Sequence, residues 1–136
     1  IVIPNLIPIE EGIKIVGTIA IFLAGAFPMV FVLEKILKRP LKKIGSALDI
    51  NETATAGLIT TLAHVIPMLA LTKDMDPRGK IVNIAFSVSA AFTFGSHLGF
   101  VAGINPEMAF PMITAKLFGG ASAIFLALLI LKKQTP

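Results

Sequence analysis

The sequence predicts an all-α fold: a fragment of a polytopic helical membrane protein, with three transmembrane helices plus one re-entrant or broken helical segment. Composition is the first reason, because 55% of the 136 residues are hydrophobic and only 15% are charged, whereas soluble domains carry about 25% charged residues. The second reason is the stretch 81–103, which contains no charged residue. At ~1.5 Å per residue, this stretch is long enough to cross a hydrocarbon core of ~30 Å.

The same composition excludes several classes of function. Although the formal net charge is +4, the basic residues gather at the ends of apolar runs, which indicates membrane orientation rather than nucleic-acid binding. The sequence has no cysteine, so it predicts neither disulfides nor thiolate metal sites. No carboxylate stands at a metal-ligand spacing from the two histidines. We therefore predict no enzyme activity, no metal site and no cofactor.

The N-terminal part of the chain contains the first predicted span. Residues 1–9 carry two prolines and should form an extended lead-in. A transmembrane helix is predicted at about 12–34, with a kink at Pro28, because proline removes one helical hydrogen bond. The linker 35–50 has five basic residues within nine positions, which predicts a short amphipathic helix on the cytoplasmic side. Because the chain does not begin with Met, we expect it to be a piece of a longer protein.

Residues 51–72 form an ambiguous segment, which Asn51 should begin as an N-cap. The segment is long enough to span, but His64 and a proline interrupt its apolar run. If it spans, six basic residues lie outside the membrane and five inside; if it enters and returns, ten lie inside and only Lys14 outside. Lys116 would lie within the membrane in both cases. The positive-inside rule therefore favours a re-entrant hairpin with its tip near residues 63–67.

Two further helices complete the predicted fold. Residues 73–80 are charged and turn-like, and are predicted to form a cytoplasmic loop before the helix 81–103. Three glycines of this helix, at 95, 99 and 103, repeat every four positions, so another helix can approach that face closely. The last helix is predicted at about 106–131, with Asn105 as its cap and two lysines after its cytoplasmic end.

The helix 81–103 is not uniformly apolar. Asn83, Ser87 and His97 lie within about half of the helix circumference, and Ser96 stands beside His97. Lipid offers no hydrogen-bond partners to such side chains, so we predict that this face contacts protein or a wet cavity.

Several short motifs in this chain, taken together, resemble one family. They are GAFPMV (25–30), TLAHVIPM (61–68), MDPRGKIVN (75–83), FSVSAAF (86–92), GSHLGF (95–100) and FPMITAKLFGG (110–120). In order and spacing they resemble the C-terminal part of the bacterial ethanolamine permeases, from about Ile15 onward. The resemblance implies a multi-pass carrier of the bacterial inner (cytoplasmic) membrane that moves ethanolamine into the cell for ethanolamine utilisation.

The implied substrate suggests where a site should lie. Ethanolamine has one ammonium and one hydroxyl group, so a carrier needs acceptors, a hydroxyl partner and an aromatic face. Broken helices near the membrane midplane are the usual place for such groups. We predict that the hairpin tip faces the polar side of the helix 81–103. The predicted substrate-binding residues are His97, Ser96, Asn83, Ser87, His64, Thr61 and Phe94, with Thr60 and Phe92 as further candidates.

Two positions depart from the pattern of the family and leave alternatives open. Ser96 stands where Asp commonly precedes the histidine, and His64-Val65 stands where relatives carry two Asn. Because Ser96 offers an ammonium ion only a dipole, a carrier of a different small amine is one alternative. A structural or assembly membrane subunit is another, and a soluble helical bundle would not leave residues 81–103 uncharged. The expected partners are ethanolamine or a similar amine, the lipid bilayer, the remaining part of the carrier and a second copy of the chain, without nucleic acid.

Overall fold

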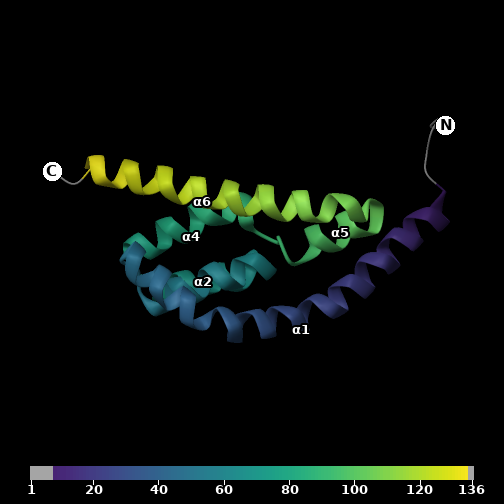
Figure 1. The fold of residues 1–136 in the computed structure, drawn as a ribbon, viewed down its shortest axis with the longest axis horizontal. Helices are drawn as coiled ribbons and strands as arrows, with labels where there is room; N and C mark the ends of the chain where they lie inside the picture. The colour runs from purple at the N-terminus through teal and green to yellow at the C-terminus, as the bar shows by residue number, and fades with distance from the viewer. Residues whose placement is uncertain (1–7, 135–136) are drawn as a thin grey trace.

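A computed structural model of the chain describes residues 8–134, apart from the side chains of Gln134 and of a number of residues in the first helix. Among these residues the chain forms α-helices and short 3-10 helices and no strand, which confirms the all-α prediction. The helices lie along the long axis of the molecule (Figure 1). The lead-in predicted at 1–9 lies outside the described residues except for its last two positions.

Helix α1 (Ile9–Leu48) is longer than the sequence predicts. It curves along one side of the molecule and passes through Pro28 and Pro40 without a break (Figure 1). The predicted helix end at residue 34 is therefore wrong. Lysine, arginine and leucine dominate the following linker and are strong helix formers, so the helix continues through the basic segment.

The end of α1 has a clear local cause. Asp49 adopts the left-handed conformation, with φ of 55°. The N–H of Asp49 donates to the carbonyl of Ser46, and the N–H of Ile50 donates to that of Gly45. These bonds satisfy the last carbonyls of the helix and turn the chain. The apolar side chains of the first predicted span lie partly outside the described residues, so that span stays a prediction.

Helices α2 (Glu52–Ala63) and α3 (Val65–Leu71) divide the segment that the sequence left ambiguous, and a 3-10 helix, η1 (Thr72–Asp74), follows them. Asn51 caps α2 as predicted, because its side chain accepts a hydrogen bond from the N–H of Ala54. After η1 the chain returns to the start of α2. The N–H of Asn51 donates to Asp76 (2.8 Å), and its side chain donates to the carbonyl of Asp74 (3.0 Å).

The stretch predicted as one helix at 81–103 is two helices in the structure, so that prediction was wrong in its middle. Helix α4 (Pro77–Ala90) begins within the predicted loop, because Asp76 caps it and Pro77 occupies its first position. The chain leaves the helix at residues 91–95 and resumes as α5 (Ser96–Ile104). The loss of helical hydrogen bonds at this break is offset by bonds to α2.

The last helix runs back along α4 and α5. A short 3-10 helix, η2 (Pro106–Met108), is capped by Asn105 as predicted, and α6 (Ala109–Gln134) follows it. Among the described residues, one helical stretch, Pro106–Lys133, is long and apolar enough to cross a membrane. Only 6% of its most apolar window is buried, so it does not have the environment of a soluble core helix.

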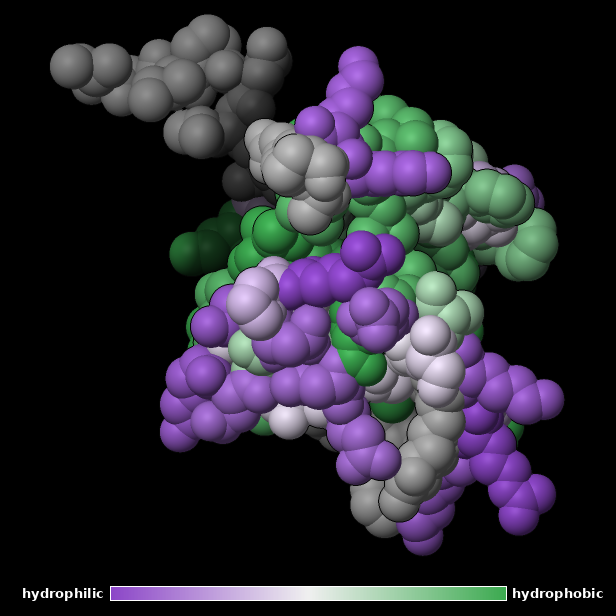
Figure 2. Space-filling view, turned by 90° about the vertical axis from the view of Figure 1, so that its left-hand side faces the viewer, coloured by the Kyte–Doolittle hydropathy of each residue, from purple (hydrophilic) through white to green (hydrophobic). Residues whose placement is uncertain are grey.

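One end of the molecule collects the polar ends of the helices. The end of α1 and the starts of α2 and α4 meet there, and Arg78 Nε donates to the carbonyl of Leu48 (2.6 Å). Figure 2 shows hydrophilic side chains, in purple, gathered over this end. Burial alone would raise the pKa of Asp76, but backbone hydrogen bonds, chiefly from Asn51 and Gly79, outweigh it and lower the pKa.

The packed interior is small and partly polar. Helices α2 and α3 pack against each other, and α2 also packs against α4. The largest side chains that are fully buried include two apolar and three polar ones, namely Met68, Val82, Asn83, Thr61 and Thr93. By contrast, large apolar side chains of α6 such as Phe118 and Phe125 are exposed. The apolar surface of this fold thus faces outward, as in a membrane protein.

Candidate functional site

Two interrupted helices meet near the middle of the molecule. The segment 91–95, between α4 and α5, lies against the C-terminal end of α2 (Figure 1). The N–H of Phe92 donates to the carbonyl of Thr61 (3.1 Å), and the N–H of Phe94 donates to that of Leu62 (2.9 Å). The last carbonyls of a helix have no partner within the helix, so the segment satisfies the end of α2. We call residues 61–64 and 91–97 the helix junction.

Two residues of the segment 91–95 have unusual surroundings or geometry. Gly95 is buried against α2, and a Cβ at this position would collide with the carbonyl oxygen of Ala63. Phe92 has φ of 61°, a left-handed conformation that residues with a large side chain rarely adopt. Such conformations persist only where the surrounding structure fixes them, and they concentrate at functional sites.

Three aromatic rings line up at the helix junction. The rings of His64 and Phe92 meet edge to face, with centroids 4.7 Å apart. The rings of Phe92 and His97 are tilted by 45°, with centroids 5.2 Å apart. Both distances lie in the range of favourable ring pairs, ~4.5–7 Å. The break in each helix therefore brings one histidine to the same phenylalanine.

His64 also has a structural task. Its backbone is extended, and its Nδ1 accepts a hydrogen bond from the N–H of Ile66 (3.2 Å), which caps α3. A neutral ring that accepts at Nδ1 carries its proton on Nε2. His64 is exposed, so this N–H is left as a donor at the surface of the junction.

The structure brings together five of the predicted site residues. His64 and Thr61 come from the end of α2, and Phe94, Ser96 and His97 come from the second break and the start of α5. Thr61 is fully buried, and its hydroxyl donates to the carbonyl of Gly57 (2.8 Å). Its contribution to the junction is therefore its backbone carbonyl.

Asn83 and Ser87, also predicted to bind substrate, lie on α4 before the break. Asn83 is fully buried, and its Nδ2 donates to the carbonyls of Ala54 (2.8 Å) and Gly79 (2.9 Å). The hydroxyl of Ser87 donates to the carbonyl of Ile84 (2.8 Å). Asn83 thus ties α4 to α2, while the role of both residues in substrate binding stays a prediction.

A cation of α6 lies near His97. Lys116 of α6 is half-buried and close enough to interact electrostatically with His97. Ser89 donates a hydrogen bond to the Lys116 carbonyl (3.1 Å), which fixes this part of α6 against α4. A positive charge here disfavours a second cation near His97.

Prediction from the sequence did not find the break at 91–95, nor that position 95 needs a glycine because it approaches the end of α2. It treated Gly95 as one of three glycines on a helix face, whereas Gly95 precedes α5 and approaches the end of α2. Gly103 does pack closely against a neighbour, Thr18 of α1. Thr93, fully buried and bonded to the carbonyl of Ala90 (2.7 Å), belongs to the turn that the break forms. A glycine within an apolar helical run was the available signal.

The sequence of the chain is similar to one known family along almost its whole length. The family described as "Ethanolamine utilisation protein, EutH" matches residues 1–130. The chain belongs to the EutH family. It is 57% identical over 123 residues to "Probable ethanolamine permease EutH" of Listeria monocytogenes, covering 90% of this chain and 33% of the relative.

Two other relatives extend the range of similarity. "Uncharacterized protein YxeR" of Bacillus subtilis is 58% identical over 90% of this chain and 33% of its own length. "Probable ethanolamine permease EutH" of Escherichia coli is 45% identical over 93% of this chain and 31% of its own length. The chain therefore spans about a third of the length of these relatives. No solved structure matches it.

Proposed function

We propose that the whole protein carries ethanolamine across the bacterial inner membrane, and that the helix junction is this chain's contribution to the substrate site. The observation that carries the proposal is the pairing of two broken helices through backbone hydrogen bonds, with His64, Phe92 and His97 in contact around them. Broken helices that face each other near the midplane are a recurring source of binding groups in carriers.

The proposal includes a definite membrane arrangement. Helix α1, the pair α4–α5 and α6 would each cross the bilayer, and the hairpin α2–α3 would enter and leave on the cytoplasmic side. Support comes from the hydrogen bonds of Asn51 to Asp74 and Asp76, which hold both ends of the hairpin together. In this arrangement ten basic residues lie at the cytoplasmic end, only Lys14 at the other, and Lys116 within the membrane, as the positive-inside rule requires.

The chemistry of the junction suits an amino alcohol. The C-terminal end of α2 carries the negative end of a helix dipole, and the N-terminal end of α5 carries the positive end. We assign the ammonium group to the α2 side, where the negative end of the helix dipole and the ring of Phe92 attract a cation. The hydroxyl group then lies toward Ser96 and His97, so the ammonium group is kept away from the positive charge of Lys116 beside His97.

The test is uptake of radiolabelled ethanolamine by cells that lack their own carrier and express the full-length protein. His97→Ala should lower uptake at least ten-fold, while the amount of protein in the membrane stays unchanged. Ser122→Ala on α6, whose hydroxyl donates to the carbonyl of Gly119 in the same helix (2.8 Å), is the matched control and should transport normally. Normal uptake by His97→Ala would overturn the assignment of the site.

A further arm addresses the identity of the amine. Ser96→Asp would place a carboxylate at the start of α5, where it gains from the helix dipole and attracts ammonium. We expect the variant to take up ethanolamine with a lower KM. Uptake of another small amine, but not of ethanolamine, by the unchanged protein would support the alternative substrate.

A further inference from the structure

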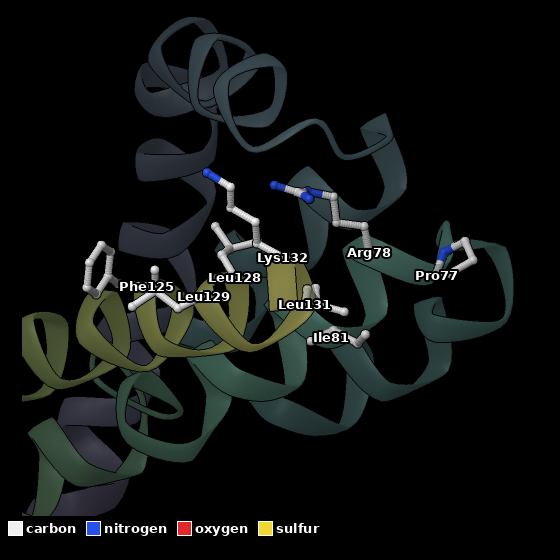
Figure 3. A pocket seen from close by; sticks show the side chains of 8 residues that line it. All are labelled: Pro77, Arg78, Ile81, Phe125, Leu128, Leu129, Leu131 and Lys132. Carbon is white, nitrogen blue, oxygen red and sulfur yellow. The ribbon is translucent and has the colours of Figure 1, made fainter. Parts of the chain in front are cut away.

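A groove at the polar end of the molecule combines apolar walls with two cations. It lies between the start of α4 and the last turns of α6 and has a volume of about 590 Å³. Figure 3 shows the residues that line it, which are Pro77, Arg78, Ile81, Phe125, Leu128, Leu129, Leu131 and Lys132. This place is distinct from the helix junction, which lies near the other end of α4.

We propose that this groove binds an anionic phospholipid. The floor is built from aliphatic and aromatic side chains, and the side chains of Arg78 and Lys132 extend to the same side above it (Figure 3). A phospholipid has this division: its phosphate needs cations, and its acyl chains need apolar walls. Basic pockets between helices at the cytoplasmic side of a membrane protein suit anionic headgroups.

The two cations are free to act on such a headgroup. Arg78 uses its Nε to bind the Leu48 carbonyl (2.6 Å), which fixes the guanidinium and leaves its terminal nitrogens for a phosphate. Lys132 stands exposed in the last turn of α6. Neither has a carboxylate partner among the residues that the structure describes.

The position along α6 decides in favour of a lipid over a soluble ligand. Leu128, Leu129 and Leu131 belong to the membrane-capable stretch Pro106–Lys133, whose apolar window is only 6% buried. Lys132 lies in the last turn of this stretch, where the hydrocarbon core would meet the headgroups. The groove has the size of small-molecule sites, ~300–1,000 Å³, enough for a headgroup and the first part of an acyl chain.

The test is native mass spectrometry of delipidated full-length protein, titrated with phosphatidylglycerol or phosphatidylcholine of identical acyl chains. Phosphatidylglycerol should bind at least five-fold more tightly, and Lys132→Gln should lower its affinity about five-fold. Lys133→Gln is the matched control, because Lys133 is equally basic but does not line the groove. It should change the affinity less than two-fold.

Two further variants keep the test decisive. Leu128→Ser should weaken both lipids, and glycerol phosphate at millimolar concentration should fail to compete, because the acyl chains supply much of the binding. The proposal is overturned if the two lysine variants behave alike, if phosphatidylcholine binds as tightly, or if glycerol phosphate displaces the lipid. Absence of lipid binding to the full-length protein would overturn it as well.

Discussion

Helix α6 and the pair α4–α5 pack against each other, yet they satisfy their backbone hydrogen bonds in opposite ways. Helix α6 is continuous from Ala109 to Gln134, and every described apolar side chain on it is at least partly exposed. The pair α4–α5 breaks at residues 91–95 and recovers two hydrogen bonds from α2. A continuous helix satisfies its own backbone and can face lipid, whereas a broken one needs protein around it. The comparison teaches that the break, not the length of the helix, marks the place where protein must surround the backbone, which is where we propose the substrate site.

The largest expected effect comes from closing the space at the break. Gly95→Ala would drive a methyl group into the carbonyl oxygen of Ala63 and separate α5 from α2. We expect a loss of stability of about 3 kcal/mol and loss of ethanolamine uptake. Gly17→Ala is the control, since a Cβ there meets nothing within 4 Å. Thermal unfolding of the two full-length variants measures the difference, and equal stabilities would contradict the account of the break.

A smaller effect is expected where α2 packs on α4. In Gly57→Ala, the added Cβ would lie 2.5 Å from both Asn83 Oδ1 and Met75 Cε. The methionine can move aside, but Asn83 is held by two hydrogen bonds. We therefore expect a loss of stability of about 2 kcal/mol, measured by thermal unfolding against the wild-type protein. An unchanged melting temperature would mean that Asn83 is not fixed between the helices.

His64 separates the structural and functional parts of the junction. His64→Ala removes the acceptor for the Ile66 N–H and should cost about 1 kcal/mol of stability, as loss of a helix cap does. His64→Asn keeps a capping side chain and should restore the stability, but not the ring contact with Phe92. Uptake should remain low in both variants if the ring serves the substrate. Full uptake by His64→Asn would show that His64 serves only as the cap of α3 and not in substrate binding.

The smallest effect concerns the polar end of the molecule, away from the break. The pKa of Asp76 is lowered below its ordinary value of 3.8, so its charged form stabilises the folded protein. This contribution is fully present above the ordinary value and is lost as the pH falls below it through the lowered pKa. Asp76→Asn should therefore flatten the decline of melting temperature between about pH 5 and pH 3. An identical decline in the variant would show that Asp76 is not responsible.

Much of the fold follows from local signals in the sequence. Asn51, Asp76 and Asn105 each accept a hydrogen bond from the first turn of the helix that they cap. Such caps can be recognised because short polar side chains satisfy free N–H groups at a helix start. The interruption at His64 was also within the predicted tip, since Pro67 cannot supply an N–H to a continuing helix.

The break at 91–95 could not be predicted in the same way. Its residues include no proline, and Phe92 and Phe94 suit an apolar helix. The chain leaves the helix where the N–H groups of Phe92 and Phe94 can donate to the carbonyls of Thr61 and Leu62 on the neighbouring helix α2. This is a tertiary cause that local propensity does not contain. The sequence therefore predicted the two histidines of the candidate site, but not the geometry that brings both of them to the ring of Phe92.

The most direct test of the central claim uses a thiol at the junction. In a full-length protein whose other positions carry no cysteine, Ser96→Cys would be exposed to an aminoethyl thiosulfonate reagent, which has the ammonium of ethanolamine. The account predicts rapid modification that blocks uptake, and protection by ethanolamine at concentrations that saturate transport. Ser122→Cys on α6 should show no protection. If ethanolamine leaves the modification rate at residue 96 unchanged, the helix junction is not the substrate site.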